Sequence, residues 1–289
     1  MAQPQGKLVQ VSRGKMHIRQ MGTGEKTIVL LPGLGCPLPT IEFAPLMRKL
    51  SKKYTVCIIE LFGYGFSDST DTPRTNENYV EEIRETLKLS GLEPPYVLMP
   101  YSASGIYAEY YASKYPNEIA GLILLDSTPT VEEFAQMWSY TKEEITEATT
   151  ALNHAEPETL PDEETINKIY AEFLSHGYTL EELEDIDEVP NHLDTLIAQD
   201  IALAGNMQEV LTMPIPKHIP ILAFTSSLIE LEDDDERIKY EKFRKDHMKR
   251  LGEKAKLVIV KESTHLNIAY HCDYLNIISE EVDEFLKFI

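Results

Sequence analysis

The feature that most constrains the fold is a succession of short apolar runs separated by helical segments. Eight runs occur: Lys7–Val11, Met16–Met21, Thr27–Leu31, Tyr54–Ile59, Tyr96–Met99, Ile119–Leu125, Ile221–Phe224 and Lys256–Val260. Most of the later runs are continuous in Val, Ile and Leu, which indicates strands buried on both faces. Helical patterns separate them at Phe43–Lys52, Asn76–Ser90, Gly105–Tyr115, Glu232–Leu251 and Asp273–Ile289. We predict an α/β fold with a mostly parallel, helix-covered central sheet. The turn at Ser12–Lys15 predicts that the sheet begins with an antiparallel hairpin.

About 95 residues separate Leu125 from Ile221, which is too long for one crossover helix. Five helical patterns lie in this gap: Val131–Tyr140, Lys142–Leu152, Glu163–Ser175, Leu180–Asp187 and His192–Ala204. We predict that residues 129–213 form an inserted helical cap over one end of the sheet. Residues 1–128 and 214–289 then form the core.

Charge and composition exclude several classes of protein. The net charge of −21 argues against nucleic acid and against an anionic membrane surface as partners. No run approaches the roughly 20 apolar residues of a membrane span. The N-terminus lacks the apolar region of a signal peptide, so we expect a cytoplasmic protein. The sequence gives no indication of the oligomeric state.

No cofactor or metal is expected from the motifs. The cysteines, Cys36, Cys57 and Cys272, have no metal-like spacing and fit a reducing compartment. The Gly63-Tyr-Gly65 turn is too short for a dinucleotide-binding fingerprint. The acidic run Glu232–Glu236 is interpreted as the start of a helix.

A serine stands between a strand pattern and a helix pattern in Pro100–Gly105. A tight turn of this kind exposes the hydroxyl of Ser102 to a base and to oxyanion donors. The motif G-x-S-x-G is broken, because Pro100 and Ser104 occupy its glycine positions. A serine at the second position implies looser packing or a hydroxyl hydrogen bond.

Other reactive groups follow the ends of other strands. In open α/β sheets, ligands bind at the carboxyl ends of the strands. Asp126 follows Leu125, and His265 follows the run ending at Val260. A serine, an acid and a histidine are therefore expected at one edge of the sheet.

Together these motifs resemble the α/β-hydrolase fold superfamily over nearly the whole chain, from about Lys7 to Ile289. Leu30–Gly35 is similar to the family's oxyanion loop, with Pro32 at the position of its usual histidine. Glu60–Asp68 is similar to the family's D-x-x-G-x-G-x-S segment. The resemblance implies that Ser102 is the nucleophile, His265 the base, and the backbone N–H groups of Leu34 and Ala103 the oxyanion hole. His271 is the alternative base.

The acid that orients the histidine is less defined. The resemblance implies an acid after the strand before the last, near Leu228 or Ile229, neither of which can hydrogen-bond an imidazole. A minority of the superfamily supplies it after the strand that follows the elbow, where Asp126 lies. We therefore predict Asp126, with Glu230 as the alternative acid and Glu232 or Asp233 as further candidates.

These residues predict a serine hydrolase that cleaves a carboxylic ester or a related small-molecule acyl substrate through an acyl-enzyme. Alternatives on the same triad are hydrolysis of an amide, a thioester or a carbon–carbon bond, and acyl transfer. A non-catalytic binding protein on the same fold is the alternative of another class. One or two of the aromatic or methionine side chains between Phe134 and Tyr140 are expected to face the pocket.

Overall fold

The computed structural model describes residues 5–154, 163–184 and 192–289. Eight strands form one sheet: β1 Lys7–Val11, β2 Gly14–Met21, β3 Thr27–Leu31, β4 Thr55–Ile59, β5 Tyr96–Pro100, β6 Ile119–Leu125, β7 Ile221–Thr225 and β8 Lys256–Ile259. Their order is β1-β2-β4-β3-β5-β6-β7-β8. β2 pairs antiparallel with β1 and β4, and all later pairs are parallel. The predicted mostly parallel sheet with an antiparallel start is confirmed.

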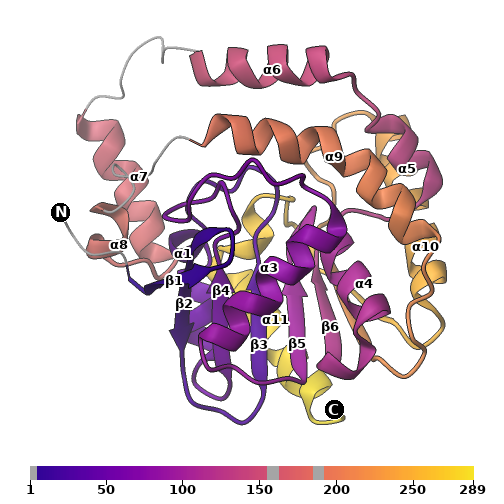
Figure 1. Ribbon diagram of the computed structural model, residues 1–289. Helices are drawn as coiled ribbons and strands as arrows, with labels where there is room; N and C mark the ends of the chain where they lie inside the picture. Colours follow the sequence, from indigo (N-terminus) through magenta and orange to yellow (C-terminus); the bar gives the residue numbers. More distant parts are fainter. Residues whose placement is uncertain (1–4, 155–162, 185–191) are drawn as a thin grey trace.

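Helices cover both faces of this sheet (Figure 1). Those of the core are α1 Pro39–Glu42, α2 Ala44–Leu50, α3 Asn76–Leu89, α4 Ser104–Lys114, α10 Asp234–Leu251 and α11 Cys272–Leu286, with 3₁₀ turns at Pro116–Glu118 and Asn267–Ala269. α3 packs on α4, and α2 packs on α11. The continuous apolar strands β3, β4, β5 and β7 are fully buried between these layers. This burial is the physical reason for their lack of alternation.

Two elements differ from the sequence prediction. The predicted helix Phe43–Lys52 is preceded by a separate short helix α1, and Phe43 caps α2, in which Pro45 occupies the first turn. Proline lacks an N–H and is best placed at the first turn, so a new helix begins there. β8 is the last strand of the sheet and is largely exposed, unlike the other late strands.

Five helices lie between β6 and β7: α5 Glu132–Met137, α6 Lys142–His154, α7 Glu163–Ser175, α8 Leu180–Glu184 and α9 Leu193–Leu211. We call this segment the insertion. Figure 1 shows α6 and α9 lying across one end of the sheet. α9 extends beyond the predicted end at Ala204. The predicted end of the fourth helix, to Asp187, lies outside the described residues. The domain boundaries at residues 129 and 213 stay a prediction.

The insertion is joined to the core by buried polar contacts. The amide of Gln199 on α9 donates to the carbonyl oxygen of Phe62 at 2.8 Å. Glu182 on α8 accepts hydrogen bonds from the guanidinium groups of Arg19 and Arg48 in the core. The carboxylate is almost fully buried, so its two cationic partners satisfy a charge that would otherwise be costly to bury. Contacts of this kind hold α8 and α9 of the insertion on the core.

No helix within the described residues is long and apolar enough to cross a membrane.

Candidate active site

Parallel register brings the ends of four strands to one edge of the sheet. Leu31 at the end of β3 pairs with Pro100 at the end of β5. Leu125 at the end of β6 pairs with Phe224 on β7. Residues that directly follow these strands therefore lie close together, as the ligand rule for open α/β sheets requires.

The predicted serine, histidine and acid lie in hydrogen-bond contact at this edge. The Ser102 Oγ is 3.1 Å from Nε2 of His265. The other imidazole nitrogen, Nδ1, is 2.8 Å from Oδ2 of Asp126. These distances fall within the range for nucleophile, base and orienting acid. The acid side chain is only 4% exposed, whereas the histidine is partly open to the surface.

Two of the three residues, Ser102 and Asp126, have a strained backbone conformation. Among the described non-glycine residues, positive φ occurs at Ser102 (52°), Asp126 (41°), Leu228 (56°) and Glu262 (60°). The first three line the same cavity. An L-residue in this region costs free energy and persists only where its surroundings impose it. The strain at Ser102 is that of a sharp strand-to-helix turn, with Pro100 at the end of β5 and Ser104 at the start of α4.

Both substituted glycine positions of the elbow have a structural account. The hydroxyl of Ser104 donates a hydrogen bond to the carbonyl oxygen of Pro32 in the loop after β3. This bond is the second of the two outcomes predicted for a serine at that position. Pro100 lies at the last position of β5, where its missing N–H is tolerated.

The loop after β3 lies directly against the elbow. A Cβ atom on Gly33 would be 3.0 Å from Cβ of Ser102, so no larger residue fits without a shift. The N–H of Gly65 donates to the carbonyl oxygen of Pro37 at 3.0 Å, which joins this loop to the Gly63–Gly65 turn. The loop carrying Leu34 is therefore fixed beside Ser102.

The two candidate acids contact different parts of the histidine. Asp126 contacts the imidazole, whereas Glu230 accepts a 2.8 Å hydrogen bond from the backbone N–H of His265. The geometry thus favours Asp126 as the orienting acid. Asp233 caps α10 by accepting from the N–H of Glu236, in line with the interpretation of the acidic run as a helix start. His271 is placed at the N-cap of α11.

Sequence reasoning missed the groups that hold the acid. Oδ1 of Asp126 accepts hydrogen bonds from the Ser226 N–H at 3.0 Å and from the Arg244 guanidinium at 2.9 Å. Burial alone would raise the pKa of Asp126, but the hydrogen bond with His265 and the charge of Arg244 outweigh burial and hold the pKa below its usual value. Asp126 is therefore ionised at neutral pH. No sequence signal singles out Arg244, because it lies within the charged helix α10.

Tyr101 supports the histidine from the other side. Its ring stacks on the imidazole of His265, with centroids 5.0 Å apart, and its hydroxyl donates to the His265 carbonyl oxygen at 2.7 Å. These contacts restrict both the ring and the backbone of the histidine.

A cavity of about 280 Å³ opens beside the three residues. Its apolar wall comes from the insertion and from the segment after β7: Pro129, Phe134, Trp138, Leu228, Leu231 and Tyr240. Of the side chains between Phe134 and Tyr140, two face the cavity. The remaining boundary is polar and includes Thr128 and Glu230.

Comparison with known proteins agrees with this fold. A family model described as alpha/beta hydrolase fold matches residues 26–158. A thermophilic esterase from Thermogutta terrifontis superposes with a TM-score of 0.67 at 18% identity, covering 97% of this chain and 98% of that one. The enol-lactonase from Burkholderia xenovorans superposes with a TM-score of 0.65 at 16% identity, covering 97% of this chain and 100% of that one. The chain therefore has the α/β-hydrolase fold, which confirms the predicted fold class and agrees with the resemblance seen in the sequence.

Relatives by sequence match over a shorter stretch. The uncharacterized protein YbdG of Bacillus subtilis is 40% identical over 121 residues, which are 42% of this chain and 37% of that protein. A pimeloyl-[acyl-carrier protein] methyl ester esterase of Xanthomonas oryzae pv. oryzae is 32% identical over 114 residues, 39% of this chain and 41% of that protein. The chain thus spans about two fifths of the length of these relatives.

Proposed function

We propose that this chain is a serine hydrolase that cleaves a carboxylic ester or a related acyl substrate through an acyl-enzyme. The observation that carries the proposal is the continuous hydrogen-bonded series from Ser102 through His265 to Asp126. A hydroxyl becomes a useful nucleophile only beside a base, and the base needs a partner that fixes its tautomer. Both conditions are met by these contacts.

The chemistry follows from these contacts. His265 Nε2 takes the proton of Ser102 as Oγ attacks the carbonyl carbon, and the resulting imidazolium is stabilised by ionised Asp126. The same proton passes to the departing alkoxide, which leaves as an alcohol. Water then attacks the acyl-enzyme, with His265 again accepting a proton, and the acid is released as Oγ is reprotonated.

The oxyanion is assigned to two backbone N–H groups, those of Leu34 and Ala103. Within the described residues, neither donates a hydrogen bond to another group. Ala103 directly precedes α4, and the loop of Leu34 is held against Ser102 by the close approach of Gly33. Donors fixed in this way stabilise a developing negative charge without reorganising, and each is worth several kcal/mol in such sites.

The size and lining of the cavity favour a short or flat apolar acyl group. At about 280 Å³ it lies at the small end of the range for ligand pockets. The ester class is also supported by the relatives and structural neighbours named as esterases. The contact between Asp126 and the imidazole also favours an enzyme over the non-catalytic binding protein, because it provides an acid although none is present at Leu228 or Ile229.

The proposal is tested with a fluorophosphonate probe and with p-nitrophenyl acetate, butyrate and octanoate. We expect covalent labelling on the peptide that contains Ser102, and faster turnover of the two shorter esters. Ser102→Ala should abolish labelling and lower kcat by about 10⁶-fold, because the nucleophile is lost. Ser279→Ala, a serine on α11, is the matched control and should retain both. A parent protein that neither labels nor turns over any ester would refute the hydrolase.

A further inference from the structure

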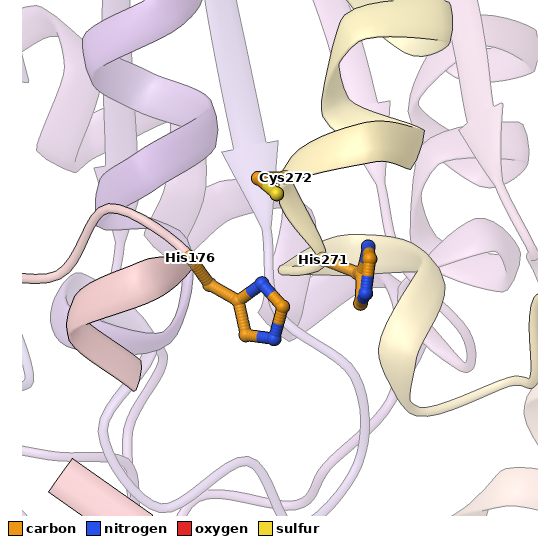
Figure 2. A group of neighbouring side chains, drawn as sticks. All are labelled: His176, His271 and Cys272. Atoms are coloured by element: carbon orange, nitrogen blue, oxygen red, sulfur yellow. The ribbon is translucent and has the colours of Figure 1, made fainter. Parts of the chain in front are cut away.

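Two histidines and a cysteine from distant parts of the chain meet at the junction of the insertion and the core. His176 follows α7 in the insertion, whereas His271 and Cys272 form the start of α11. One possible ligand atom from each residue lies within 4.8 Å of the other two. Figure 2 shows the imidazole of His176 reaching toward the turn that carries His271 and Cys272. This group plays no part in the hydrolase chemistry described above.

The cluster contains a polar atom whose burial is otherwise unexplained. The side chain of His176 is only 9% exposed, and its Nδ1 is buried without a hydrogen-bond partner. Buried polar atoms are almost always paired, so an unpaired ring nitrogen requires an explanation. The ring lies 4.3 Å from that of His271, centroid to centroid, with no hydrogen bond between them. A ligand shared by the two rings would satisfy the orphaned nitrogen.

The donor set identifies the class of ligand. Two imidazole nitrogens and one thiolate sulfur suit Zn²⁺ and its close neighbours, whereas Ca²⁺ and Mg²⁺ prefer oxygen ligands. Around a tetrahedral Zn²⁺, with bonds of about 2.0–2.3 Å, neighbouring donors are roughly 3.5 Å apart. The donors here lie within 4.8 Å of one another, so at most small rotations of the side chains are needed to close the site. Acidic side chains nearby, Glu172 at 3.9 Å from His176 Nε2 and Asp273 beside Cys272, favour a cation.

One existing contact bears on the binding nitrogen of His271. Its Nδ1 accepts a long hydrogen bond, 3.4 Å, from the N–H of Asp273 at the start of α11. Coordination through Nε2 places the ring proton on Nδ1 and gives up this bond, whereas coordination through Nδ1 replaces it. In either case the metal displaces only the weak hydrogen bond by which His271 caps α11.

We propose that His176, His271 and Cys272 bind one zinc-class divalent cation, with a fourth position left to water or an exogenous ligand. The bound cation tethers the insertion to α11 and stabilises the folded chain through binding. Cysteine spacing gives no sign of this site, because its ligands come from two segments far apart in the sequence.

The test uses the full chain freed of metal with a chelator, and Co²⁺ as a spectroscopic substitute for Zn²⁺. We expect the absorption bands of a tetrahedral cobalt–thiolate site, saturating at one equivalent and removed by one equivalent of Zn²⁺. Of the three cysteines, Cys272 alone is not buried. Zn²⁺ should therefore also protect one thiol from a disulfide reagent such as DTNB and raise the Tm.

Variants separate this site from adventitious binding. His176→Ala removes a direct ligand, so it should weaken Zn²⁺ binding by more than the roughly 10–100-fold typical of losing a group that only orients a ligand, and should abolish thiol protection while leaving the thiol itself reactive. Cys272→Ser should remove the cobalt–thiolate band. His218→Ala, an exposed histidine outside the cluster, should behave as the parent. Circular dichroism of each variant confirms that it is folded.

Two outcomes would overturn the site: no cobalt–thiolate band in the parent protein, or a His176→Ala protein that is folded and binds Zn²⁺ as tightly as the parent. The inference is independent of the proposed hydrolase, because Ser102→Ala should lose esterase activity and still bind the metal with parental affinity.

Discussion

The loops after β6 and β7 lie side by side at the edge of the sheet that carries the candidate active site, yet they make different contacts with the same histidine, His265. The β6 loop contributes one carboxylate, Asp126, which contacts the imidazole. The β7 loop contributes the Ser226 N–H to that carboxylate and Glu230 to the backbone of His265. The β6 loop therefore supplies the carboxylate charge, and the β7 loop holds both that carboxylate and His265 in place.

The two loops have a similar backbone conformation. Asp126 and Leu228 both have positive φ, so each loop turns sharply after its strand. At the first turn the side chain is a carboxylate, and at the second it is a buried leucine that lines the cavity. The two loops thus turn alike, but the turn after β6 carries the acid and the turn after β7 forms part of the pocket wall.

Among substitutions in these two loops and their contacts, the largest expected effect comes from removing the charge of the β6 loop. Asp126→Asn keeps the size of the side chain but cannot stabilise the imidazolium and favours the wrong tautomer. Loss of this acid costs about 10⁴-fold in kcat in related chemistry. We expect a loss of about 10³–10⁴-fold in kcat for p-nitrophenyl butyrate, with KM changed little. Near-parental turnover would show that another carboxylate is the acid.

The double variant Asp126→Asn with Leu228→Asp sharpens the same comparison. If the two loops are equivalent routes to the imidazole, an aspartate at Leu228 should recover at least about tenfold of the lost kcat. Leu228→Asp alone is the control, and it should lower activity, because it places a second carboxylate in an apolar wall. No recovery in the folded double variant would mean that the β7 loop cannot orient the acid.

A smaller effect is expected from the cation that holds Asp126. Arg244→Met leaves the buried carboxylate without its ion-pair partner, which should lower the free energy of unfolding by about 1–3 kcal/mol at pH 7. The side chains of Arg244 and Asp126 are 18% and 4% exposed, so solvent screens this pair weakly.

The sign of the pH dependence follows from the direction of the shift. The pKa of Asp126 in the folded state is lowered, so its stabilising contribution is complete above the pKa of the unfolded carboxyl, about 4, and is lost as the pH falls through the folded value. The stability difference between the parent and Arg244→Met, measured by urea unfolding, should be constant from pH 8 to 5 and shrink below pH 4. A difference that stays constant below pH 4 would contradict the ion pair.

The sequence predicts the strand ends well and the supporting contacts poorly, for a physical reason. Asp126 directly follows β6, Ser102 lies two residues after β5, and His265 lies in the loop six residues after β8, so local pattern and parallel topology suffice to bring them to one edge. Arg244 and Ser226 act through tertiary contacts, and arginines at helix surfaces are common without any such role. The sequence does not indicate the proposed metal site for the same reason, because His176 lies far along the chain from His271 and Cys272 and meets them only in the folded protein.

The smallest effect is expected at Glu230, the carboxylate of the β7 loop. Glu230→Gln keeps an oxygen that can accept the 2.8 Å hydrogen bond from the His265 N–H, so the histidine loop should stay in place. Since this group positions the backbone and does not touch the imidazole, we expect kcat to change less than about fivefold. Glu230→Ala removes the acceptor and should cost more, about tenfold, because an N–H loses its partner. A loss for Glu230→Gln as large as that for Asp126→Asn would reverse the roles of the two loops.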